Sequence, residues 1–142
     1  MCSSDLDASP VLGLNDDVIF AGRDGYIRSL PTFSTNADNV ATWEELVGDV
    51  FYSSPIVDEN GWIYVIAYAG GGDNHLFCFD ALGNRQWDSS ADGFSFTIDG
   101  VVDSSPALSA DGKLYFGCYD SNLYCLNLSE GPAPSEIGRA HV

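Results

Sequence analysis

Three cysteines inside the chain carry its most reactive side chains. Cys78 and Cys125 occupy the same position in two similar stretches of sequence, and we expect both to be small buried hydrophobic residues of a strand. Cys118 lies a short turn before Cys125. If that turn consists of Ser121 and Asn122, the two cysteines face each other across a hairpin, within the range of a disulfide in an oxidising compartment. The sequence contains no Cys-x-x-Cys pair, which disfavours a structural zinc site.

Two polar loops are further candidates for ligand binding. Residues 58–61, Asp-Glu-Asn-Gly, resemble part of a calcium loop but lack its later glutamate and its ligand spacing, so we interpret them as a hairpin turn. The glycine-rich residues 70–74 are an insertion that is either a flexible connector or a rim loop for a partner, with Gly71, Asp73 and Asn74 as its candidate binding residues. No Lys-Ser/Thr follows these glycines, so they do not form a phosphate loop.

Length and composition limit the scaffold that can hold such loops. The chain has 142 residues, enough for one domain, and 21 acidic against 5 basic residues, a net charge of −16. A surface this acidic does not attract phosphate backbones, so we expect no nucleic-acid partner. No apolar run approaches the ~20 residues of a membrane span. The 45% of hydrophobic residues and the 15 glycines favour a folded protein of strands and turns.

An internal repeat organises the chain. Its anchors are Pro10, Pro55 and Pro106, each at the start of a unit that continues as strand, turn, strand, turn and strand. The first turns contain Asn-Asp, Asn-Gly and Asp-Gly, residues that tolerate the positive φ of tight hairpins. The strand over 62–68 is apolar on both of its faces, which predicts that both are covered. Repeats of ~40–50 residues with several short strands are typical of propeller blades.

A fourth strand follows in two of the three units. It is expected over 40–46 around Trp43 and over 84–88 around Trp87. The third unit ends at Gly131, before it reaches its own fourth strand, and residues 130–136 are interpreted as a connection cut short. The units are therefore placed at about 8–48, 49–103 and 104–131.

The repeated Ser-Ser-Pro, the Asp/Asn-Gly-x-Ile/Leu-Tyr strand and the Leu-Tyr/Phe-Cys-Leu/Phe strand resemble the PQQ-like repeat family, which builds seven-bladed or eight-bladed β-propellers. Residues 80–87 are similar to its docking motif, shortened by one residue before the glycine. In the family, the tryptophan of that motif packs between neighbouring blades. The resemblance implies an all-β fold, a partial β-propeller of about three four-stranded antiparallel blades with the last one incomplete, in which the structural repeat motif consists of Pro55, Tyr64, Gly83, Trp87, Pro106 and Tyr115.

The resemblance implies a non-catalytic scaffold that binds a protein or polymer partner, together with the remaining blades of a parent propeller. The alternative is part of a dehydrogenase that binds pyrroloquinoline quinone (PQQ) and Ca²⁺ beside an adjacent cysteine pair. This sequence has no adjacent cysteine pair, so that site would lie in other blades. We therefore assign no catalytic, cofactor-binding or metal-binding residue here, and expect a periplasmic, cell-envelope or extracellular location.

The two ends have an unusual relationship. Residues 1–5 and 137–141 can be encoded by the two strands of one DNA sequence, if a GTG start codon encodes Met1, and that sequence resembles a sequencing adapter. We therefore interpret residues 1–6 and 137–142 as translated adapter and residues 7–136 as natural sequence. This predicts a gene fragment whose terminal blades expose apolar faces, and hence an isolated chain that aggregates.

Overall fold

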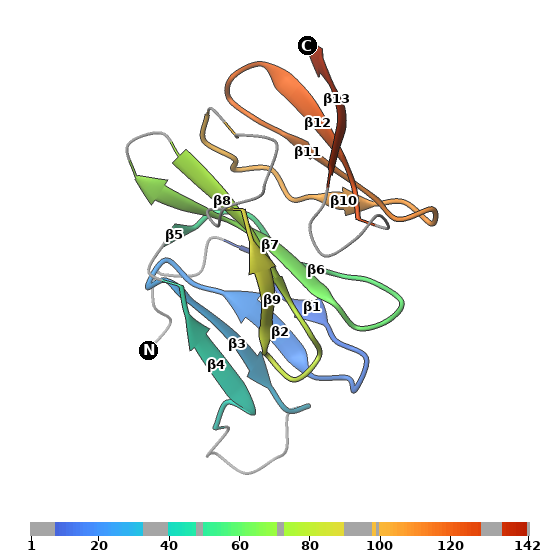
Figure 1. Cartoon of the computed structure of the whole chain (residues 1–142). Helices are drawn as coiled ribbons and strands as arrows, with labels where there is room; N and C mark the ends of the chain where they lie inside the picture. Colours follow the sequence, from blue (N-terminus) through green and yellow to red (C-terminus); the bar gives the residue numbers. More distant parts are fainter. Residues whose placement is uncertain are drawn as a thin grey trace.

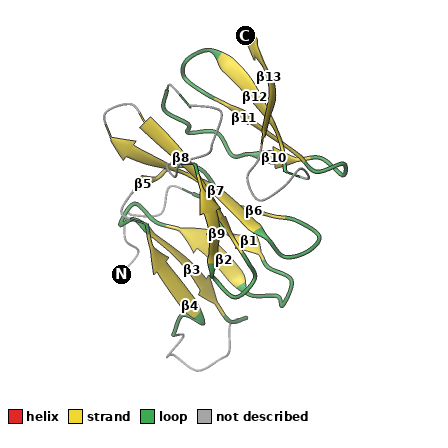
Figure 2. Cartoon of the chain, in the orientation of Figure 1, coloured by secondary structure: helices red, strands yellow, loops and turns green. Residues whose placement is uncertain are grey.

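The computed structural model describes residues 8–32, 40–47, 50–70, 73–89, 98, 100–128 and 135–141. All regular structure in this part of the chain is β, as expected (Figure 2). It forms three antiparallel sheets that follow one another along the chain, with the middle sheet between the other two (Figure 1).

The strands of each sheet lie side by side in chain order, and in the middle sheet two short strands share the first edge. The first sheet contains β1 (Val11–Leu12), β2 (Val18–Ala21), β3 (Tyr26–Leu30) and β4 (Trp43–Leu46). The middle sheet contains β5 (Val50–Phe51) and β6 (Ile56–Val57), which both pair with β7 (Ile63–Gly70), followed by β8 (Asp73–Phe79) and β9 (Arg85–Asp88). The third sheet contains β10 (Ala107–Leu108), β11 (Lys113–Gly117), β12 (Asn122–Asn127) and β13 (Ser135–His141).

The third sheet corrects one expectation. We expected its blade to be incomplete, but β13 pairs with β12 along the full length of that strand, from Asn122 opposite His141 to Asn127 opposite Ser135. A strand at a sheet edge pairs through its backbone N–H and C=O groups, which almost any residue supplies. β13 has no tryptophan like those in β4 and β9, so its side chains gave no signal for a fourth strand.

The six short hairpin turns share one geometry. In each turn the N–H of the fourth residue donates to the C=O of the first, and the N–H of the first donates to the C=O of the fifth. The fourth residue has a positive φ in every case, between 59° and 85°. Those residues are Asp16, Gly25, Gly61, Gly83, Gly112 and Ser121. This pattern is a type I turn with a bulge, one residue longer than the tightest hairpin. Asp16, Gly61 and Gly112 thus have the positive φ that the sequence predicted for the first turns, whereas the positive φ of Ser121 was not predicted.

The three sheets stack in one direction. We call the face that carries the residue after each repeat proline the front of a sheet, and the opposite face its back. Register places four residues in each front row, one on each strand: Val11, Ile19, Ser29 and Trp43; Ile56, Tyr64, Cys78 and Trp87; and Ala107, Tyr115, Cys125 and Gly138.

Two cores lie between the sheets. In the first, Ile19, Ala21 and Ile27 on the front of the first sheet pack against the back of the middle sheet. In the second, Ile66 and Leu76 on the front of the middle sheet pack against the back of the third. The middle sheet is therefore apolar on both faces because both are covered, as predicted for its central strand.

The Ser-Ser-Pro motif joins the first strand of a unit to the second. The Ser53 hydroxyl donates to the Ile66 C=O over 3.0 Å and accepts from the Ile66 N–H over 3.3 Å. The Ser104 hydroxyl does the same with Gly117 over 2.8 and 3.0 Å. The hydroxyl thus takes the place of a backbone partner just before the proline, which has no N–H to donate.

Candidate functional site

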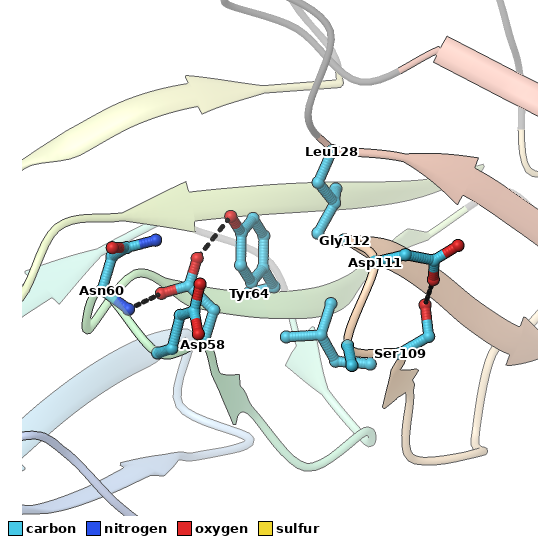
Figure 3. Close-up of a pocket in the computed structure, with 10 residues that line it drawn as sticks. Asp58, Asn60, Tyr64, Ser109, Asp111, Gly112 and Leu128 are labelled. Atoms are coloured by element: carbon cyan, nitrogen blue, oxygen red, sulfur yellow. Dashed lines mark hydrogen bonds between the residues drawn. The ribbon is translucent and has the colours of Figure 1, made fainter.

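A groove of about 660 Å³ lies between the middle and third sheets, at the end where their first turns meet (Figure 3). Its walls are the turn between β6 and β7 and the turn between β10 and β11. Leu108, Leu128 and the buried ring of Tyr64 form its apolar part. Its polar part carries three carboxylates, on Asp58, Glu59 and Asp111.

Hydrogen bonds within each turn hold the walls of the groove in place. One Asp58 carboxylate oxygen accepts from the Asn60 N–H over 2.9 Å, and the other accepts from the Tyr64 hydroxyl over 3.3 Å (Figure 3). The first oxygen also accepts from the Trp62 N–H over 2.8 Å. On the opposite wall, the Ser109 hydroxyl donates to Asp111 over 2.6 Å. The turns are thus fixed by their own polar groups, and the groove is a preformed shape.

The Asp111 carboxylate also binds Lys113 on β11. The hydrogen bond from Lys113, followed by that from Ser109, holds the pKa of Asp111 below its ordinary value. Asp111 therefore stays ionised well below neutral pH, and its charge is balanced by that of Lys113.

The residues behind the groove are not nucleophiles. Burial raises the pKa of the Cys78 thiol, and the Asp58 carboxylate raises it further. Burial likewise raises the pKa of the Tyr64 hydroxyl, with added contributions from Cys78 and Asp58. Both groups are protonated at neutral pH, so neither a thiolate nor a phenolate is present to attack a substrate.

A side chain contacts the turn at the equivalent place between the first and middle sheets. A Cβ built on Gly61 would lie 2.7 Å from the Leu14 Cδ1, which shows that Leu14 of the first sheet rests on the turn of the middle sheet. The residue in the same turn position of the middle sheet is Glu59, which is exposed. Leu14 contacts the neighbouring turn although it is 57% exposed. Glu59, at the same turn position, lines the groove between the middle and third sheets.

The candidate rim-loop residues are placed as follows. Gly71 lies outside the described residues, and Asp73 is the first residue of β8. Asn74 also belongs to β8 and is buried. Its amide donates to the Gly100 C=O and accepts from the Val102 N–H, so it fastens the middle sheet to the segment that leads into the third. The Asn74 side chain therefore serves an internal contact.

The residues of the docking motif contact different partners. A Cβ on Gly83 would lie 2.4 Å from the Trp43 Cδ2, so the turn after β8 packs directly on the tryptophan of the preceding sheet. The Trp43 ring also lies 6.5 Å from that of Phe79. Trp87 is half-buried, packs against the second core and lies 6.0 Å from Tyr64, centre to centre. The two tryptophans, at equivalent positions, thus each lie at a boundary between sheets.

The remaining repeat residues have structural positions. Pro55 and Pro106 are buried directly before β6 and β10. Tyr64 lies in the front row of the middle sheet and Tyr115 in that of the third.

The conditional disulfide between Cys118 and Cys125 is not formed. Both are free, as is Cys78. The Cys118 N–H donates to the C=O of Asn122, and Cys125 lies opposite Tyr115, so the two cysteines are out of register. The hairpin turn is longer than the two residues that the pairing required, and the extra residue shifts the register.

The described residues contain no group of three His, Cys, Asp or Glu side chains arranged to hold a metal ion. None of the described segments forms a helix with the length and apolarity to cross a membrane. A scan of the sequence against protein-family models and a search of curated proteins both give no match. The site is therefore interpreted from its own geometry.

Proposed function

We propose that the three sheets are consecutive blades of a β-propeller of the PQQ-like repeat type and that the protein is a non-catalytic scaffold for a protein partner. The observation that carries the proposal is the groove between the middle and third sheets. The Asp58 and Asp111 carboxylates are engaged in building its walls, while the exposed Glu59 carboxylate lies beside an apolar floor. Rigid loops on a repeated scaffold are a common setting for binding.

The repeated stacking supports the propeller arrangement. The front of the first sheet packs on the back of the middle sheet, and the front of the middle sheet packs on the back of the third. Both contacts use equivalent rows. Val11 and Trp43 pack against the first core, and Ile56 and Trp87, at the same register positions, pack against the second. Repeats of this kind each bury one face on the next neighbour.

The chemistry of the groove favours a basic segment of the partner. Lysine and arginine side chains combine an apolar stem with a cationic end. The stem fits against Leu108 and Leu128, and the cation fits beside the exposed Glu59 carboxylate. The net charge of −16 adds a long-range attraction for such a segment.

The test uses a fluorescein-labelled dodecapeptide of lysines spaced by alanine and leucine, with a glutamate counterpart. We expect fluorescence anisotropy to show binding of the lysine peptide, weaker at high salt, and none of the glutamate peptide. The decisive variant is Glu59→Leu, which copies Leu14 and fills the groove. It should weaken binding by about tenfold or more.

Asp16→Asn is the matched control, because it removes one carboxylate from the corresponding turn of the first sheet, outside the groove. Equal loss in Glu59→Leu and Asp16→Asn would mean that the peptide senses only net charge, and would refute the groove as the binding site. No binding of the lysine peptide at low salt would refute the basic partner.

A further inference from the structure

Lys113, the only lysine of the chain, lies at one wall of the groove. It is the first residue of β11 and directly follows the turn that forms this wall. Its ammonium binds the carboxylate of Asp111, which lines the groove. The Lys113 side chain is 32% exposed and that of Asp111 is 63% exposed, so the pair is in contact with solvent. A cation that arrives from solvent therefore meets a carboxylate that already holds one.

The turn itself places the two charged groups together. The Ser109 N–H donates to the Lys113 C=O over 2.9 Å, and the Lys113 N–H donates to the Ser109 hydroxyl over 3.0 Å. The same hydroxyl donates to Asp111 over 2.6 Å. These bonds fix the third and fifth positions of the turn, which carry the acid and the base. The same positions in the turn of the opposite wall carry Asn60 and Trp62, which are uncharged.

The two walls therefore offer different carboxylates to a ligand. Both oxygens of the Asp111 carboxylate are in use, since Lys113 binds one and the Ser109 hydroxyl donates to the other. A second ammonium at Asp111 must replace Lys113 or lie beside it, and like charges at that distance repel each other. On the opposite wall, the Glu59 side chain is exposed.

We propose that Lys113 is an internal competitor of the basic partner segment and limits the affinity of the groove for it. Its ammonium makes with Asp111 the contact that a lysine of the partner would otherwise make. A partner cation reaches Asp111 only by displacing Lys113. The inference rests on the proposed function, because it concerns the same groove and the same class of partner.

Binding of the labelled lysine peptide tests this role through the charge of Lys113. Lys113→Gln should bind the peptide about two- to fivefold more tightly, the range expected of one exposed ion pair. Lys113→Arg keeps the cation and should bind as the wild type does. Arg85→Gln is the matched control, because Arg85 is 34% exposed and pairs with Glu45 of the first sheet. It changes the net charge equally, so a gain as large as that of Lys113→Gln would overturn the proposal.

Nuclear magnetic resonance of protein labelled with ¹³C-lysine observes Lys113 directly, because one lysine gives one Cε signal. Without peptide, the signal of the wild type should differ from that of Asp111→Asn, which lacks the ion pair. The lysine peptide should move the wild-type signal towards that of Asp111→Asn, and the glutamate peptide should leave it in place.

The two readouts separate the failure of this inference from that of the proposed function. A lysine peptide that binds without moving the Lys113 signal would overturn the inference and leave the proposed function intact. Identical signals in the wild type and Asp111→Asn without peptide would overturn the inference whatever the peptide does. Absence of peptide binding to both the wild type and Lys113→Gln would refute the basic partner, and the inference with it.

Discussion

The front rows of the middle and third sheets pair the same residue types in different surroundings. Tyr64 lies opposite Cys78 and is 4% exposed, whereas Tyr115 lies opposite Cys125 on a face that no described residue covers. Sequence and register are the same, and only the presence of a neighbouring sheet differs. The comparison shows that burial in a repeat protein belongs to the interface between units and not to the unit itself.

Truncation of the two tyrosines tests this comparison most strongly. Tyr64→Ala should lower the free energy of unfolding by about 3–4 kcal/mol, because it leaves a cavity at the second interface. Tyr115→Ala should cost about 1 kcal/mol in dilute protein, where its face is bare. Urea unfolding of both variants gives the two values. Equal losses would show that the two faces are equally buried.

The second largest expected change in the free energy of unfolding comes from the contact of Gly83 with Trp43. Gly83→Ala adds a Cβ where φ is +85° and where the Trp43 ring lies 2.4 Å away, so it should cost about 3 kcal/mol. Gly61→Ala has nearly the same φ, +83°, but meets the end of the exposed and flexible Leu14. It should therefore cost only the conformational part, about 1–2 kcal/mol. Thermal unfolding of the two variants separates packing on the tryptophan from backbone strain, and a larger loss in Gly61→Ala would contradict the contact.

Ser53 and Ser104, whose hydroxyls bond the backbone of the neighbouring strand, should differ less in their effect on the free energy of unfolding. Ser53→Ala leaves the N–H and C=O of Ile66 without their hydroxyl partner in a fully buried place, and should cost about 2 kcal/mol. Ser104→Ala, whose hydroxyl is only partly buried, should cost about 1 kcal/mol. Urea unfolding again measures both. Losses in the reverse order would mean that burial does not set the strength of the bridge.

The smallest effect concerns the bare back of the first sheet. The hydrogen bond from Arg28 holds the pKa of Asp24 below its ordinary value, against a smaller effect of burial. A carboxylate with a lowered folded pKa stabilises the protein above the unfolded value, near pH 4, and loses that contribution as the pH falls through the folded value. Asp24→Asn should therefore destabilise by less than about 1 kcal/mol at pH 7, because the pair is exposed. Its difference from wild type should shrink below pH 4, and a difference that grows in acid would contradict the pairing.

Much of the local structure could be predicted from the sequence. Alternating apolar residues, turn residues that tolerate positive φ and a proline before each first strand are local properties. Together with the tryptophans of the fourth strands, they located β1 to β4 and β6 to β12. The strand over 62–68 was predicted to be covered on both faces, and Val65 and Ile66 do belong to different cores. Such predictions succeed because backbone preferences act over a few residues.

Other features could not be predicted because they depend on partners distant in the chain. β5 pairs with β7 through only two residues, and β13 pairs through its backbone, so neither has a side-chain pattern of its own. The groove depends on Glu59 and on a second turn about 50 residues later.

The sequence by itself determined that three similar units fold into antiparallel sheets, since each unit contains its own alternation of apolar residues and its own turn residues. Only the tertiary structure decided which faces meet. It buried Tyr64 and left Tyr115 partly exposed, and it placed Leu14 against one turn and Glu59 at the wall of the groove. The physical reason is that apolar burial is a property of two surfaces in contact, and a single unit contains only one of them.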